Sequence, residues 1–317
     1  MKIYRDLNAI PEFKNTVITI GSFDGVHPGH RHIIEQMKSY AHHINGETLL
    51  VTFYPHPRIA LAEQKGVDAG MKLLCQLDEK AAHLEQCGMN NLVVVPFTKN
   101  FSEQSPDEYI EDFLVRYFHP KVIVIGYDHR FGKGRIGDIE YLKKFQDKYG
   151  FIVIEISKQE VDGIAVSSSK IRTALEMGDV ALADKLLGYP YAIQGTVVGG
   201  KQIGRTLGFP TANISVPDKH KLIPPVGIYA VLIHIDEQQY KGMLYIGSRP
   251  TLDEGLECAI EVHIFEFHDS IYDKTVKIDF IDFLRADEKF DSLDELKAQL
   301  QKDMDAALNR LKDIILT

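Results

Sequence analysis

The chain has 317 residues, of which 44% are hydrophobic. This length and apolar content suit two ordinary domains, each with its own core. Lysine and arginine number 36 against 45 aspartate and glutamate residues, so the net charge is -9. Such an acidic balance disfavours nonspecific binding to nucleic acid, which relies on a broad positive surface.

The sequence contains no sign of a membrane or secretory segment. No stretch approaches the roughly 18 consecutive apolar residues of a membrane span, and the first residues lack the apolar core of a signal peptide. Cys75, Cys87 and Cys258 are widely spaced and odd in number, which argues against a disulfide framework or a metal site. We therefore expect a cytoplasmic protein with reduced, buried cysteines and no membrane partner.

The first half alternates short apolar runs with stretches of helical character. Strands are expected at 17–20, 48–53, 92–95, 122–125 and 152–156, and helices at 29–44, 78–87 and 106–118. Ser105 is a plausible cap of the last helix, with Pro106 in its first turn. Continuous apolar strands separated by helices predict a parallel α/β sheet with buried strands.

The pattern changes near Gly188. Alternating strands are expected at 229–235, 242–246, 260–267 and 276–283, separated by turn residues without helices. These predict an antiparallel domain, most simply a small β-barrel. Residues 293–311 form an amphipathic helix whose apolar stripe is expected to pack, and the stripe consists of Leu293, Leu296, Leu300, Met304, Leu308 and Leu311. The expected domains are therefore residues 1–187 and 188–317.

The segment 21–30, Gly-Ser-Phe-Asp-Gly-Val-His-Pro-Gly-His, follows the first of these strands and opens the first helix. Such turns lie at the edge of the sheet where α/β proteins bind ligands, and a helix N-terminus attracts phosphate. Gly25 and Gly29 allow a phosphate close to the backbone, and His27 and His30 can donate hydrogen bonds to it. The alternatives are a capped helix with surface histidines and, more weakly, a zinc site without a recognisable third ligand.

Two further glycine-rich segments have competing interpretations. Residues 132–137 fit G-x-G-x-x-G, with Glu155 at the end of the next strand. We reject a dinucleotide site because residues 127–131 separate the glycines from the preceding strand. We favour a loop whose Lys133 and Arg135 cover a triphosphate, and a flexible basic loop is the alternative.

Residues 199–206 almost fit a P-loop, but Arg205 replaces the required lysine and no helix is expected at 207–210. A glycine-rich flap over phosphates remains open. In the irregular stretch that follows, Thr211 and Asn213 either satisfy a turn or supply hard oxygen ligands to Mg²⁺.

These segments together resemble the bifunctional riboflavin kinase/FMN adenylyltransferase family, the bacterial FAD synthetases. The resemblance runs nearly from end to end and is carried by residues 21–30, 52–57, 126–132, 167–172, 204–213, 246–251, 261–263 and 284–285. The string Gly-Arg-Thr-Leu-Gly-Phe-Pro-Thr-Ala-Asn at 204–213 is highly specific for the kinase. The resemblance implies a Rossmann-like nucleotidyltransferase domain followed by a riboflavin kinase barrel with a terminal helix.

For the second half, the resemblance implies phosphorylation of riboflavin by ATP. Glu261 matches the general base that takes the proton of the riboflavin 5′-hydroxyl. Thr211 and Asn213 match ligands of Mg²⁺, and Arg285 matches a residue at the flavin end. The residues expected around the nucleotide are Gly199, Lys201, Gly204, Arg205 and Pro210.

For the first half, the resemblance implies transfer of an adenylyl group from ATP to FMN. His27 and His30 are expected to bind the triphosphate and stabilise the transition state. Ser168 and Arg172, at the start of a short helix, are expected to hold the departing phosphates. The other residues expected to contact the nucleotide are Gly21, Phe23, Asp24, Gly25, Gly29 and Asp128.

The sequence departs from the family at Tyr245, where Asn is usual, at His129, where Phe is common, and at Ser169, often Thr. Tyr245 puts a turn-stabilising hydrogen bond in question. For Arg285, an alternative to the flavin role is a salt bridge to an acidic residue in the segment 287–288.

Two rival functions are weighed against this interpretation. One is a different nucleotidyltransferase fused to a barrel, against which the kinase string argues. The other is a non-catalytic flavin-binding regulator, against which the intact candidate catalytic residues argue. The sequence leaves the oligomeric state open.

Overall fold

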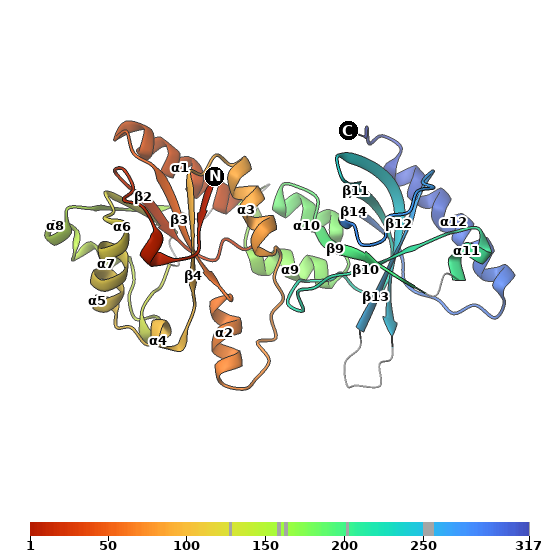
Figure 1. The fold of residues 1–317 in the computed structure, drawn as a ribbon, viewed down its shortest axis with the longest axis horizontal. Helices are drawn as coiled ribbons and strands as arrows, with labels where there is room; N and C mark the ends of the chain where they lie inside the picture. Colours follow the sequence, from red (N-terminus) through yellow and green to blue (C-terminus); the bar gives the residue numbers. More distant parts are fainter. Residues whose placement is uncertain (127–128, 157–159, 162–163, 201–202, 250–256, 317) are drawn as a thin grey trace. The chain divides into compact units, whose positions relative to one another are not determined.

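The computed structural model describes residues 1–317 except 127–128, 157–159, 162–163, 201–202, 250–256 and 317. The chain divides into two compact units, Met1–Ser168 and Ser169–Thr317 (Figure 1). The boundary expected at Gly188 lies further along the chain, after helices α9 (Ser168–Glu176) and α10 (Val180–Leu187).

The first unit is built on a six-stranded sheet with the order β1-β4-β3-β2-β5-β6, in which every pair of neighbouring strands is parallel. Its strands are β1 (Lys2–Tyr4), β2 (Val17–Ile20), β3 (Thr48–Tyr54), β4 (Asn91–Pro96), β5 (Val122–Gly126) and β6 (Ile152–Ile156). Strands β3 and β4 lie on one side of β2, and the next strands along the chain, β5 and β6, lie on its other side. The strand order therefore reverses between β2 and β5, which is where open α/β sheets bind ligands.

Alternate residues of the central strands face two separate cores. Ile18 and Leu49 belong to one core, together with Phe113 from the segment 106–118. Val17 and Leu50 belong to the other, which is closed by α1 and α3. The helices of this unit are α1 (Pro28–His43), α2 (Pro57–Gln64), α3 (Leu77–Gln86), α4 (Lys99–Ser102), α5 (Pro106–Glu108), α6 (Arg116–Phe118), α7 (Ile139–Lys143) and α8 (Gln146–Tyr149). The predicted parallel α/β sheet is confirmed.

Two of the predicted elements of this unit have a different character in the structure. The helix expected at 106–118 begins as predicted, with Ser105 accepting from the backbone N–H of Glu108, but its centre, Tyr109–Val115, is a π-helix. Strand β6 was expected to be buried, yet it lies at the sheet edge and Ile152 is 49% exposed. An edge strand has only one neighbour, so it needs less apolar cover.

The second unit contains a closed barrel with the strand order β10-β13-β12-β11-β14-β9, and its paired strands are antiparallel. The strands are β9 (Ala192–Val198), β10 (Ala212–Ser215), β11 (Gly227–Ile235), β12 (Gln238–Arg249), β13 (Glu257–Ile264) and β14 (Thr275–Arg285). The barrel prediction is confirmed. The sequence did not indicate β9, the short helix α11 (Ile203–Leu207), or β10 within the stretch taken as irregular.

The terminal helix α12 (Leu293–Leu311) begins at its cap Ser292 and covers part of the outer face of the barrel. Ala307 and Leu311 are fully buried there. The expectation that the whole apolar stripe packs is wrong at two positions, because Leu293 is 65% exposed and Leu308 is 41% exposed. Only the middle and the end of this helix therefore stabilise the barrel.

Cys75 is buried and Cys87 is half-buried, and both are free thiols. Burial was predicted for all three cysteines, so the prediction is wrong for Cys87, and the side chain of Cys258 lies outside the described residues. Within the described ranges, no helix is both long and apolar enough to cross a membrane.

Candidate active sites

The turn between β2 and α1 lies at the point where the strand order of the sheet reverses. Its backbone is held in unusual conformations, with φ of 45° at Phe23 and 34° at Val26, beside Gly25 at 86°. Such left-handed conformations cost free energy outside glycine and persist only where the surroundings fix them. Helix α1 then begins at Pro28, and the His27 side chain makes no capping hydrogen bond. The start of the helix is therefore not closed by its own cap.

His27 and His30 stack on each other with their ring centroids 3.7 Å apart, and His30 also stacks on Phe23 at 4.5 Å. His27 is only 6% exposed, which contradicts the alternative of surface histidines. Burial lowers the pKa of His30 well below its ordinary value, and the neighbouring His27 and Lys80 lower it further. His30 is therefore neutral near pH 7, with one ring nitrogen available as a hydrogen-bond donor.

Asp24 fastens this turn to the segment before α3. Its carboxylate is 2% exposed and accepts hydrogen bonds from the backbone N–H groups of Leu74 (3.0 Å) and Cys75 (3.1 Å). The Ser168 hydroxyl donates to the Asp24 carbonyl at 2.8 Å, so the start of α9 reaches the same turn. Arg172 lies one turn further along α9, on the side of the helix that carries Ser168.

The remaining candidate residues of this unit lie in the segment that follows β5. Asp128 lies outside the described residues. Lys133 and Arg135 are exposed in a loop that is closed by a β-bridge between Phe131 and Gly137. A loop of this shape differs from the strand–turn–helix of a dinucleotide site, which supports the rejection of that motif. Whether the loop covers a triphosphate stays a prediction.

In the second unit, the candidate kinase residues form one row across the barrel. Asn213 on β10 pairs with Glu261 on β13, and Glu261 pairs with Tyr245 on β12. Tyr245 in turn pairs with Ile228 on β11, which pairs with Arg285 on β14. Strands lie about 4.8 Å apart, so Glu261 and Arg285 are separated by about 14 Å along the sheet. Paired residues of neighbouring strands point to the same side, which places this row on one face.

The Thr211 hydroxyl donates a hydrogen bond to the Glu261 carboxylate at 3.2 Å. Thr211 and Asn213 thus bring a hydroxyl and an amide oxygen beside a carboxylate, a donor set suited to Mg²⁺. A Cβ atom at Gly200 would lie 2.0 Å from the Asn213 amide nitrogen, so only glycine leaves that side chain its space. No cluster of three His, Cys, Asp or Glu side chains among the described residues could hold a metal. The fit to Mg²⁺ therefore depends on the neutral oxygens of Thr211 and Asn213 beside Glu261.

Around these groups, the glycine-rich stretch is only partly described. Gly199 has open space around its Cα, whereas a Cβ at Gly204 would meet the Phe209 carbonyl oxygen at 2.3 Å. Lys201 and the side chain of Arg205 lie outside the described residues. The Pro210 carbonyl lies 2.7 Å from His263 Nδ1, which holds the loop against β13.

Tyr245, the departure from the family, is fixed on both sides. Its ring lies over Gly247, where a Cβ would come within 2.4 Å of the phenol oxygen, and its hydroxyl donates to Asp287 at 3.1 Å. Burial, with the nearby negative charges of Asp287 and Glu261, raises the pKa of Tyr245 to about 12. The phenol therefore makes a hydrogen bond at this position, although to a residue beyond the strand.

Arg285 does not form the salt bridge suggested as an alternative in the segment 287–288. It pairs instead with Asp303 of α12, with Nε to Oδ1 2.8 Å and Nη2 to Oδ2 2.7 Å. The sequence could not identify this partner, because Asp303 lies among residues whose only visible pattern is helical periodicity.

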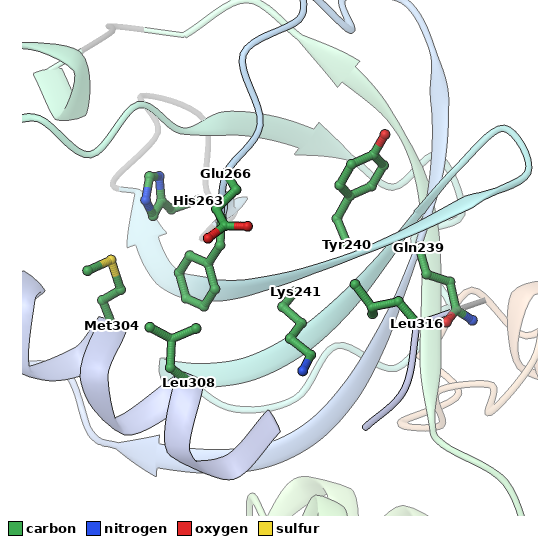
Figure 2. A pocket seen from close by; sticks show the side chains of 9 residues that line it. Gln239, Tyr240, Lys241, His263, Glu266, Met304, Leu308 and Leu316 are labelled. Carbon is green, nitrogen blue, oxygen red and sulfur yellow. The ribbon is translucent and has the colours of Figure 1, made fainter. Parts of the chain in front are cut away.

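A cavity of about 660 Å³ opens between α12 and strands β12 and β13 (Figure 2). It joins His263, two residues beyond Glu261 on the same face of β13, to apolar side chains of α12. Its lining residues are Gln239, Tyr240, Lys241, His263, Phe265, Glu266, Met304, Leu308 and Leu316. Burial lowers the pKa of His263, so its ring is neutral near pH 7. This cavity could not be predicted from the sequence, because its walls come from segments that are distant along the chain.

The first unit has a strand-to-helix turn at the reversal point of a parallel sheet, and the barrel places a hydroxyl and an amide beside a carboxylate. Together these features are those of a two-domain transferase that uses nucleotides. Residues 9–170 match the FAD synthetase family, and residues 187–311 match the riboflavin kinase family. The chain therefore belongs to the bifunctional riboflavin kinase/FMN adenylyltransferase family. Membership assigns to it the two activities of that family.

Several relatives support this placement over nearly the whole chain. The bifunctional riboflavin kinase/FMN adenylyltransferase of Listeria monocytogenes is 38% identical over 91% of this chain and 90% of its own. That of Haemophilus influenzae is 36% identical over 97% and 98%, and that of Escherichia coli K12 is 35% identical over 96% of each chain. A crystal structure described as a macrolide-efflux protein from Streptococcus pneumoniae has a TM-score of 0.87 at 31% identity, covering 97% of this chain and 98% of that one.

Proposed function

We propose that the barrel phosphorylates riboflavin with Glu261 as the catalytic base. We also propose that the α/β unit adenylylates FMN with His27 and His30 as the residues that bind the reacting phosphates. The two activities are those of the family to which the chain belongs, and the proposal concerns which residues carry out each activity. His27 and His30 lie in the first unit, and Glu261 lies in the second.

In the kinase step, the riboflavin 5′-hydroxyl attacks the γ-phosphorus of ATP and ADP leaves. Glu261 accepts the proton of that hydroxyl, and its carboxylate is oriented by the hydroxyl of Thr211. Arg285 orients the flavin end of the substrate. The observation that carries this assignment is the row Asn213–Glu261–Arg285, which presents a phosphate-side group, a base and a cation on one face.

Thr211 and Asn213 would hold Mg²⁺, which would supply charge neutralisation for the phosphates of ATP. Gly199, Lys201, Gly204, Arg205 and Pro210 surround the triphosphate in this proposal. The side chains of Thr211 and Asn213 are neutral, so the positive charge that the phosphates require would come from the ion and from Lys201 and Arg205.

In the adenylyl step, a phosphate oxygen of FMN attacks the α-phosphorus of ATP and pyrophosphate leaves. The attacking oxygen is already anionic, so positioning and charge stabilisation are the main requirements. His27 and His30 donate to the phosphates at the uncapped start of α1, while Ser168 and Arg172 hold the leaving pyrophosphate. Gly21, Phe23, Gly25, Gly29 and Asp128 complete the nucleotide site, and Asp24 shapes it through the backbone of the segment before α3.

The test is incubation of the full chain with riboflavin and ATP, with the flavins separated by chromatography over time. FMN is expected first and FAD second, with pyrophosphate released in proportion to FAD alone. Addition of EDTA is expected to stop FMN formation, and excess MgCl₂ to restore it. Absence of FMN from the complete mixture would contradict the proposal, and full FMN synthesis in EDTA would contradict the metal assignment.

A further inference from the structure

Lys80, on helix α3, is an unusual lysine because its side chain is buried. It is 7% exposed, and the described residues offer it neither an ion pair nor a side-chain hydrogen bond. Lysine is rarely buried without a partner, because an uncompensated charge in the interior is costly. No motif in the sequence singles out this lysine.

The fold brings Lys80 to the turn between β2 and α1 by two connections. Asp24 binds the backbone of Leu74 and Cys75, directly before α3, and the Gly25 N–H donates to the Cys75 sulfur at 3.1 Å. On α3 itself, Ala81 and Leu84 pack in the same core as Phe23 and Val26 of the turn. Helix α3 is therefore anchored to this turn at its entrance and along one face.

The positive charge of Lys80 influences His30 of this turn. This charge is one cause of the low pKa of His30, after burial and His27. His30 Nδ1 is itself buried without a hydrogen-bond partner among the described residues. The ring of His30 stacks on Phe23, which packs in the same core as Ala81 and Leu84 of α3. The largely buried Lys80 side chain and the unpartnered His30 Nδ1 therefore belong to one region at a helix start, an arrangement that an anionic ligand would compensate.

We propose that Lys80 binds the β- and γ-phosphates of ATP in the adenylyl step and holds the pyrophosphate that leaves. The inference rests on the proposed role of His27 and His30. In the step, the bond between an FMN phosphate oxygen and the α-phosphorus forms while the α–β bridging bond breaks. The electron pair of that bond leaves on pyrophosphate, and Lys80 stays protonated and offsets the charge.

The experiment uses the full chain with Lys80→Met, which keeps the apolar length without the charge, and Lys80→Arg, which keeps the charge. Lys65→Met, at an exposed position after α2, is the matched control. Loss of one preorganised donor to a reacting phosphate typically costs about 10²–10³ in rate. We expect Lys80→Met to lower kcat/KM for FAD formation by about 10²-fold, and Lys80→Arg to retain much of it.

Three readouts separate phosphate binding from a structural role. Pyrophosphate binding, measured by calorimetry, is expected to weaken at least tenfold in Lys80→Met, in the range of a charge-assisted contact. FMN formation in the barrel should be unchanged, and the melting temperature should stay the same or rise, because an uncompensated charge has been removed. Lys65→Met should match the wild type throughout.

Wild-type pyrophosphate affinity and FAD synthesis in Lys80→Met would overturn the inference. The inference would also be overturned if both Lys80 variants lost FAD synthesis and had lower melting temperatures but still bound pyrophosphate with wild-type affinity. That result would indicate a structural role. If the wild-type chain itself made no FAD, the proposed function would fail first. If replacing His27 and His30 stopped FAD synthesis while Lys80→Met did not, only the role of Lys80 would fail.

Discussion

Arg285 and Asp303 form a two-point ion pair that ties the last residue of β14 to the terminal helix, with side chains 18% and 4% exposed. Removing one partner of a buried pair typically costs about 3–5 kcal/mol, because the other charge stays buried alone. We expect Asp303→Ala to lower the free energy of unfolding of the barrel and to raise the KM for riboflavin, because Arg285 loses its orientation. Urea unfolding and steady-state kinase assays measure the two effects.

Asp303→Asn is the control, since it keeps the shape of the side chain and one hydrogen bond to Arg285. Its effect should be smaller in both measurements. A wild-type KM for riboflavin in a folded Asp303→Ala variant would show that the ion pair only stabilises the fold.

Glu261→Gln tests the base of the kinase step. Glutamine keeps the size and can still accept the Thr211 hydrogen bond through its amide oxygen, but it cannot take the proton. Loss of a general base usually costs about 10²–10⁴ in rate, so FMN formation should fall by this factor. Conversion of supplied FMN to FAD should continue at the wild-type rate. Near-normal FMN synthesis in this variant would indicate another base.

His27→Asn combined with His30→Asn tests the adenylyl site. FMN should accumulate with little FAD, since each lost donor typically costs about 10²–10³ in rate. Because His27 is buried and both rings stack, we also expect a lower melting temperature than replacement of two surface histidines would give. Flavin chromatography and thermal unfolding distinguish the effects; FAD synthesis at the wild-type rate would rule out the assignment.

Fragments of the chain test where the second domain begins. Helix α10 buries Val180, Ala183 and Leu186, and Asp184 accepts a hydrogen bond from the Tyr191 N–H at 2.7 Å. A fragment 169–317 keeps these contacts, whereas 188–317 loses them, at about 1.5–3 kcal/mol per fully buried large apolar side chain. Both are expected to phosphorylate riboflavin and make no FAD, with 169–317 the more stable in urea. An unfolded 188–317 would move the boundary to α9.

The pH dependence of stability should reveal Asp184. Burial, with the negative charge of Asp279 nearby, raises its pKa to about 8, against 3.8 for an ordinary aspartate. The folded protein holds this proton up to about pH 8 while the unfolded chain releases it near 3.8, so stability falls as pH rises through this window. Asp184→Asn should be more stable than the wild type at pH 8, with a smaller difference at pH 5 in urea unfolding. A pH-independent difference would contradict the shift.

The sequence by itself determined the two kinds of domain, because their signals are local. Buried parallel strands are continuous apolar runs, barrel strands alternate, and capping residues such as Ser105 mark helix starts within a few positions. It also indicated His27 and His30, because a strand-to-helix turn with glycines and histidines suits phosphate, whereas Glu261 was predicted through the family resemblance alone. Prediction from the sequence was wrong where burial depends on residues that are distant along the chain. Examples are the edge position of β6 and the exposure of Leu308.

Only the tertiary structure decided which groups meet. Strand pairing joins Asn213, Glu261 and Arg285 into one row, although they lie on three separate strands. Helix packing gives Arg285 its partner Asp303, and the hydrogen bonds of Asp24 fasten the segment before α3 to the turn that carries His27. Contacts of this kind depend on chain closure and packing across many residues, whereas the sequence displays only the preferences of each segment.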